Sequence, residues 1–120
     1  MKYLIMIYSS LPGWDQLSPD EQMAFGRGHL ALTEELGATG ELVVSEGLGD
    51  RALATTVAVR EGRTLTTDGP YAEAKEHLAG FYLVDVADHA RAVELAAKVP
   101  DARYGQVELR PVLDMSGWEM

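Results

Sequence analysis

The stretch SPDEQMAFGRGHLALTEEL, residues 18–36, carries the strongest local signal in the chain and predicts a long helix. Ser18 can cap the helix, Pro19 suits its first turn, and Glu21 stands where a capping box places its carboxylate. Two glycines after Leu36 predict its end: Gly37 and Gly40. Because this helix follows a short stretch that is apolar on both faces, residues 3–8, the sequence opens with a covered central strand and a helix.

The remaining elements continue this alternation of strands and helices. A second helix is expected after Asp88, with its apolar stripe ending before Pro100. Glu61-Gly62 is expected to form a two-residue hairpin turn. The expected strands are residues 3–8, 42–44, 55–60, 63–67, 81–86 and 106–110. This order predicts one α+β domain over residues 1–120, a ferredoxin-like sandwich with an antiparallel sheet.

Helices on one face of such a sheet leave its other face partly apolar. Soluble proteins rarely expose a large apolar face to water. We therefore expect a homodimer that forms through the open sheet face.

Composition limits the classes of function. The 120 residues hold 10 Lys+Arg and 19 Asp+Glu, and the net charge of −9 argues against a nucleic-acid partner. The absence of cysteine excludes disulfides, thiolate metal sites and a cysteine nucleophile. Residues 3–8 are far shorter than the ~18 apolar residues of a membrane span, and they lack the features of a signal peptide. We expect a cytoplasmic protein with no membrane partner and no cofactor.

The densest polar stretch, residues 66–77, connects two expected strands. Its Asp-Gly-Pro sequence, beginning at Asp68, is a turn signal. One interpretation is a solvated connection; the other is a loop that directs Asp68, Glu73 or Lys75 into a pocket on the sheet. A metal site built from Glu73 and His77 is a weaker alternative, because such ligands often fall together by chance on a surface turn.

His29 is the other candidate for chemistry. It lies on one helical stripe with Phe25, Leu32 and Leu36, so its imidazole is expected to face the sheet. One interpretation is a structural histidine; the other is an acid–base group in a cavity between helix and sheet. A buried imidazole needs a hydrogen-bond partner, and a carboxylate such as Asp68 would orient it.

The motif Asp68-Gly69-Pro70-Tyr71-x-Glu73-x-Lys75-Glu76, followed by residues 80–86 (GFYLVDV), resembles the DGPF branch of the YCII-related proteins. That branch has phenylalanine where this chain has Tyr71. The opening residues 1–8 and the closing residues 107–111 are similar to the branch as well.

The resemblance implies a ferredoxin-like subunit that forms a dimeric α+β barrel. In the wider family, a histidine within a His-Leu pair of the first helix is proposed as part of an acid–base site, and His29-Leu30 occupies a similar place. Related sequences often have Asp-Pro where this chain has Val99-Pro100-Asp101, so Asp68 is taken as the candidate partner. DGPF proteins are often encoded beside extracytoplasmic-function sigma factors, which implies a stress-linked role.

Two hypotheses follow from these observations. The first is a small cofactor-free enzyme that acts on a small polar organic molecule. His29 would be the catalytic acid or base, Asp68 its partner, and Tyr71, Glu73 and Lys75 would shape the ligand site. The second is a non-catalytic dimer that binds a ligand or serves as a stress-linked accessory module.

Overall fold

The first helix begins as its sequence predicts. The structure is a computed structural model that describes residues 1–8, 16–69 and 77–114. In α1 (Pro19–Thr39), the Ser18 hydroxyl accepts a hydrogen bond from the Glu21 N–H at 3.1 Å, and the Glu21 carboxylate accepts one from the Ser18 N–H at 2.9 Å. Gly40 ends the helix in the left-handed conformation, with φ of 79°. The helix therefore extends through Gly37, slightly beyond the predicted end.

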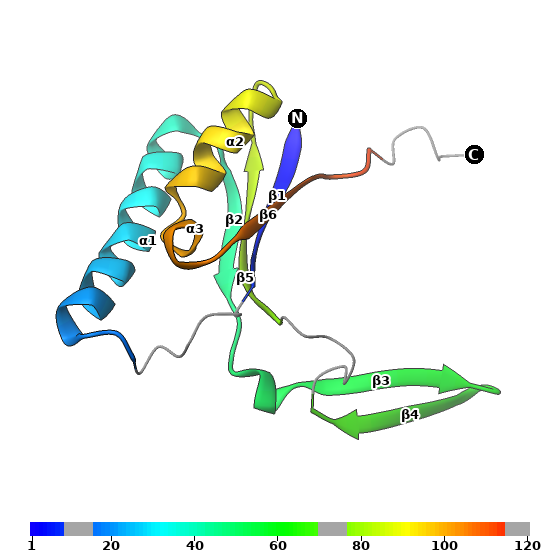
Figure 1. The fold of residues 1–120 in the computed structure, drawn as a ribbon. Coiled ribbons are helices and arrows are strands. Elements are labelled where there is room, and N and C mark those ends of the chain that lie inside the picture. The colour runs from blue at the N-terminus through cyan, green and yellow to red at the C-terminus, as the bar shows by residue number, and fades with distance from the viewer. Residues whose placement is uncertain (9–15, 70–76, 115–120) are drawn as a thin grey trace.

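Four strands form an antiparallel sheet in the order β2-β5-β1-β6. They are β1 (Lys2–Tyr8), β2 (Leu42–Gly47), β5 (Leu78–Asp85) and β6 (Val107–Pro111). The central place of β1 is as predicted, and it pairs with β5 on one side and with β6 on the other. This arrangement is an α+β fold, consistent with the ferredoxin-like class (Figure 1).

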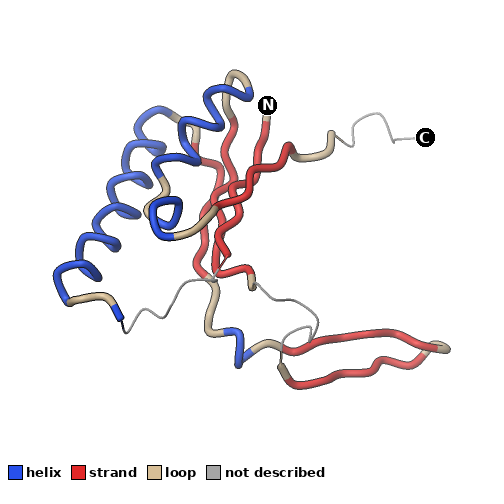
Figure 2. The backbone as a smooth tube through the Cα atoms, viewed as in Figure 1, coloured by secondary structure: helices blue, strands red, loops and turns tan. Residues whose placement is uncertain are grey.

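The three described α-helices lie on one side of this sheet, as Figure 2 shows. The second helix, α2 (His89–Lys98), is capped by the Asp88 side chain, which accepts from the Arg91 N–H, and it is followed by the short α3 (Asp101–Tyr104). The predicted apolar stripe of α2 is buried against the sheet and α1. The core between the layers consists of Tyr3, Ile5, Ile7, Leu32, Leu36, Tyr82, Val84, Val86, Ala92, Leu95, Ala96 and Val99.

The opposite face of the sheet has no helix over it in the described part of the chain. Alternation along the strands places Leu4 and Met6 of β1 on this face, next to Leu83 and Phe81 of β5. The sequence predicts that both faces of the first strand are covered, but in the described chain helices cover only one of them. The dimeric barrel that the resemblance implies stays a prediction.

The predicted hairpin is present but does not join the main sheet. Strands β3 (Thr55–Arg60) and β4 (Arg63–Asp68) pair only with each other among the described strands, and a 3-10 turn, η2 (Arg51–Leu53), precedes them. Glu61 and Gly62 form the turn with φ of 51° and 75°, as a two-residue type I′ turn requires. Figure 1 shows that this segment, residues 51–68, projects away from the helices and the sheet. We call it the arm.

Within the described ranges, no helix is both long enough and apolar enough to cross a membrane.

Candidate functional site

His29 lies between α1 and the sheet, on the helix face that the sequence predicts. Its side chain is 26% exposed, so the imidazole is partly shielded from water but can still be reached. Leu32 and Leu36, which follow on the same stripe, are buried in the core. The Thr33 hydroxyl donates a hydrogen bond to the backbone carbonyl of His29 at 2.9 Å, one turn along the helix.

Both ring nitrogens of His29 are hydrogen-bonded to side chains. Nε2 lies 2.8 Å from Oδ1 of Asp101, and Nδ1 lies 2.6 Å from the hydroxyl oxygen of Tyr82. An ionised carboxylate can only accept, so Nε2 carries the proton. In the neutral ring Nδ1 is then an acceptor, and the Tyr82 hydroxyl donates to it. The contacts thus define a directed chain from tyrosine to imidazole to carboxylate.

A close approach between α1 and the α2–α3 connection brings Asp101 to His29. Gly28 precedes the histidine, and a Cβ atom at this position would lie 2.7 Å from Cγ of Pro100. Only a glycine therefore lets Pro100 pack this close to the helix. Asp101 is 8% exposed, and among the described residues it is the charged one that is buried. Burial of a carboxylate is costly unless it is paired, and the bond to His29 supplies the partner.

Tyr82 reaches the same point from the sheet. It sits in the middle of β5 opposite Ile5, and its ring is nearly parallel to that of His29, with 5° between the planes and 5.9 Å between the centroids. Burial raises the pKa of the Tyr82 hydroxyl above its usual 10.0, the Thr33 hydroxyl opposes this rise, and the negative charge of Asp101 adds to it. Tyr82 is therefore a neutral hydrogen-bond donor at physiological pH.

A cavity of about 420 Å³ opens beside these three residues. Phe25 and Tyr82 give it aromatic surface, and Thr33 and Ser45 add polar groups. Phe81 and Glu46 border the cavity from the strands, where alternation turns their side chains towards the open face of the sheet. Neither lysine nor arginine is among the described residues that line it. A volume of this size suits a small organic molecule. The lining favours a neutral or positively charged molecule over an anion.

The predicted site residues fall in different parts of the chain. His29 lines the cavity, whereas Asp68 is exposed at the end of β4 in the arm. The structure does not bring Asp68 to His29, because Asp68 belongs to the separate hairpin; Asp101 and Tyr82 bind the two ring nitrogens instead. Tyr71, Glu73 and Lys75 lie outside the described residues. The described residues also contain no cluster of three or more His, Asp or Glu that could hold a metal ion.

Sequence reasoning missed Asp101 and Tyr82 as members of the site. Tyr82 could have been found, since a tyrosine in a buried strand needs a partner for its hydroxyl. Asp101 gave a weaker signal: it follows Pro100 at the end of a helix, where an exposed aspartate is common. Its role depends on the approach of Pro100 to Gly28, which joins positions far apart in the sequence.

Comparison with known proteins finds matches that span most of the chain. The family model of the YCII-related domain matches residues 1–116. The chain is also similar to an uncharacterized protein of Rhizobium meliloti (strain 1021), at 31% identity over 114 residues that cover 93% of this chain and 92% of the relative. Placement within the DGPF branch stays a prediction from the motif at residues 68–76.

Proposed function

We propose, from the premise that this chain belongs to the YCII-related family, that it is a small enzyme that moves a proton on a small organic molecule. The observation that carries the proposal is the hydrogen-bonded chain of Tyr82, His29 and Asp101 at the wall of a cavity. Acid–base catalysis needs a proton carrier within hydrogen-bond reach of its partners, and this chain meets that requirement.

The three side chains have distinct roles in this proposal. A substrate C–H or O–H bond breaks and its proton goes to the Tyr82 oxygen, while the Tyr82 proton passes to Nδ1 of His29. The resulting imidazolium is stabilised by the Asp101 carboxylate at Nε2, 2.8 Å away. Reversal of the same steps returns the proton to another atom of the substrate. Burial raises the pKa of Tyr82, so the tyrosine is protonated at neutral pH and can donate to Nδ1 of His29.

The charge of the cavity narrows the substrate class. Glu46 and Asp101 are the charged residues of its described lining, and the chain as a whole carries −9. An anion would enter a negative field with no basic side chain of that lining to meet it. The proposed substrate is a neutral or cationic molecule with an aromatic or apolar part that can pack on Phe25.

The proposal includes a homodimer formed through the open sheet face. Its support is the row of apolar side chains on that face, Leu4 and Met6 beside Phe81 and Leu83. A cytoplasmic location is also part of the proposal and rests on composition alone.

The test begins with ligand discovery, because a substrate must be found before turnover can be compared. A panel of small neutral, cationic and anionic carbonyl and hydroxylated aromatic compounds is screened for binding by proton NMR. Each binder is then incubated with the protein in D₂O, and exchange of its carbon-bound protons or conversion to product is followed. We expect turnover of at least one neutral or cationic binder.

Matched variants separate catalysis from binding. Tyr82→Phe and His29→Gln are expected to lower turnover by about 10²-fold or more, with little change in ligand affinity. Asp68→Asn serves as the control and should leave turnover unchanged, since Asp68 does not line the cavity. Equal turnover in wild type and His29→Gln would contradict the proposal.

A second candidate function, a non-catalytic binding module, is favoured by one observation. Within the described residues, no buried side-chain nitrogen or oxygen lacks a hydrogen-bond partner. The chain of Tyr82, His29 and Asp101 is thus complete without a ligand, as a purely structural network would be. This alternative predicts binders that are neither exchanged nor converted, and a loss of stability rather than of turnover in the His29→Gln variant.

A further inference from the structure

The arm exposes apolar side chains to solvent. Val57 and Val59 of β3 are 60% and 59% exposed, and alternation places them on one face of the hairpin. Their cross-strand neighbours on that face are Thr66 and Thr64 of β4. An isolated two-stranded hairpin is at best marginally stable in water. No residue of the arm belongs to the core between sheet and helices, so the described chain gives the arm little support.

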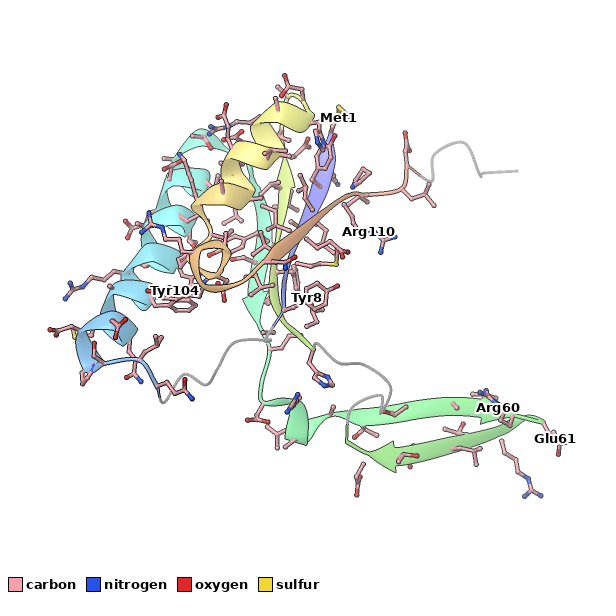
Figure 3. All side chains as sticks on the ribbon, viewed as in Figure 1. Met1, Tyr8, Arg60, Glu61, Tyr104 and Arg110 are labelled. Carbon is pink, nitrogen blue, oxygen red and sulfur yellow. The ribbon has the colours of Figure 1, made fainter. Side chains whose placement is uncertain are left out.

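The arm and the rest of the chain carry opposite net charges. Residues 51–68 hold three arginines and two acidic residues, so the arm carries +1 and the rest of the chain −10. Arg60 and Arg63 face each other across the turn, where like charges repel unless carboxylates lie nearby. Figure 3 shows Arg60 and Glu61 at the far end of the arm, away from the acidic body of their own chain. In a second copy of the chain, the acidic residues of the body could lie next to these arginines.

We propose that the arm docks on a second copy of this chain, with the face of Val57 and Val59 against the partner and the arginine tip near the partner's carboxylates. The exchange is mutual, because a twofold pair places the same arm on both subunits. Two observations on this chain support a second copy as the occupant: the unsupported hairpin with its exposed valines, and the opposite charges of arm and body. The inference is independent of the proposed proton transfer.

The test is the association constant of the full chain measured by sedimentation equilibrium. Wild type is expected to be a dimer, and Val57→Asp/Val59→Asp to weaken association by at least about 100-fold, since two buried valines become charges. The control is Val93→Asp on α2, where the side chain is 47% exposed; it should associate like wild type. A monomeric wild type, or a double variant that associates as tightly as wild type, overturns the proposal.

A second measurement covers the case in which the double variant fails to fold. The chain has no cysteine, so Val59→Cys and Val93→Cys each provide a single thiol. In the dimer, we expect the thiol at position 59 to be labelled at least about 10-fold more slowly than that at position 93, because docking covers it. Equal labelling overturns the proposal. So does protection that persists in a monomeric fraction, because that result assigns the cover to the same chain.

Discussion

At the scale of single residues, the environment of His29 combines two properties that a structural histidine rarely needs together. Its ring is bonded at both nitrogens, to Asp101 and to Tyr82, and it also borders a cavity large enough for a ligand. The bonds fix the tautomer and orientation of the ring, while the cavity gives a substrate access. This combination supports acid–base chemistry more directly than burial alone.

Replacing the buried carboxylate tests its bond to the imidazole. Asp101→Asn is expected to lower the free energy of unfolding by about 1–3 kcal/mol, because a hydrogen bond assisted by charge becomes a neutral one. Turnover should fall by about 10²-fold. Asp68→Asn is the control, and its effect on the free energy of unfolding should stay within about 0.5 kcal/mol. Urea denaturation measures the free energy of unfolding of both variants. A larger loss of stability in Asp68→Asn than in Asp101→Asn would contradict our assignment of Asp101 as the partner of His29.

The raised pKa of Tyr82 predicts how stability depends on alkaline pH. Above pH 10.0 the unfolded chain releases the tyrosine proton while the folded chain still holds it. Stability from this residue is therefore complete below pH 10.0 and is lost as the pH rises towards the folded-state pKa. Tyr82→Phe should show a smaller fall in the free energy of unfolding over this alkaline range. Identical slopes in denaturation series of the two proteins would contradict the shift.

The sequence predicted the position of His29 but not the partner of its side chain. The place of His29 followed from helical periodicity, since a stripe with Leu32 and Leu36 must face the core. The identity of its partner did not follow, because it depends on how closely α1 and the α2–α3 connection approach. Asp68 carried the stronger motif, yet Asp101 makes the hydrogen bond.

At the scale of elements, the position of α1 against Pro100 determines the geometry of the site. Gly26 and Gly28 both lie within the helix, but only Gly28 meets a neighbour: nothing lies within 4 Å of a Cβ built at Gly26. Alanine substitution at either glycine therefore changes helix propensity equally, but only the substitution at Gly28 also changes packing.

Alanine substitutions separate these two effects. Gly26→Ala should raise the free energy of unfolding by up to about 1 kcal/mol, through helix propensity alone. Gly28→Ala should lower it by about 1–3 kcal/mol, because the new methyl group overlaps the Pro100 ring, and it should also reduce turnover by displacing Asp101. Thermal and urea unfolding measure the pair. Equal stabilisation by both substitutions would show that Pro100 yields at no cost.

Local sequence signals predicted the elements well. The capping box at Ser18, the Asp88 cap of α2 and the Glu61-Gly62 turn are all confirmed, because each depends on residues a few positions apart. The independence of the arm was not predicted. Whether a hairpin joins a sheet or stands apart depends on pairing between distant strands, and no local pattern in residues 55–68 reports on that.

At the scale of the whole molecule, the chain is an acidic α+β body with an arm of opposite charge. The body follows from the order of elements in the sequence, which predicted an antiparallel sheet with helices on one face. The separate arm does not follow from composition, because a hydrophobic content of 47% is ordinary for a compact domain. Only the structure shows the hairpin leaving the body.

Association through the arm links stability to protein concentration. We expect the wild-type thermal midpoint to rise with concentration over a 100-fold dilution series, since the dimer stabilises its folded subunits by mass action. In Val57→Asp/Val59→Asp the midpoint should vary less, because its subunits associate more weakly. Scanning calorimetry at matched salt provides the comparison. A wild-type midpoint independent of concentration would argue against a dissociable dimer.

The most direct test of the central account is to establish which nitrogen of His29 carries the proton in the neutral ring. A long-range ¹⁵N–¹H correlation spectrum of the imidazole identifies the tautomer, with Tyr82→Phe and Asp101→Asn to assign the two contacts. The account predicts a proton on Nε2, held by Asp101, and a bare Nδ1 that accepts from Tyr82. A proton on Nδ1 would contradict it, because the tyrosine could then no longer pass its proton to the ring.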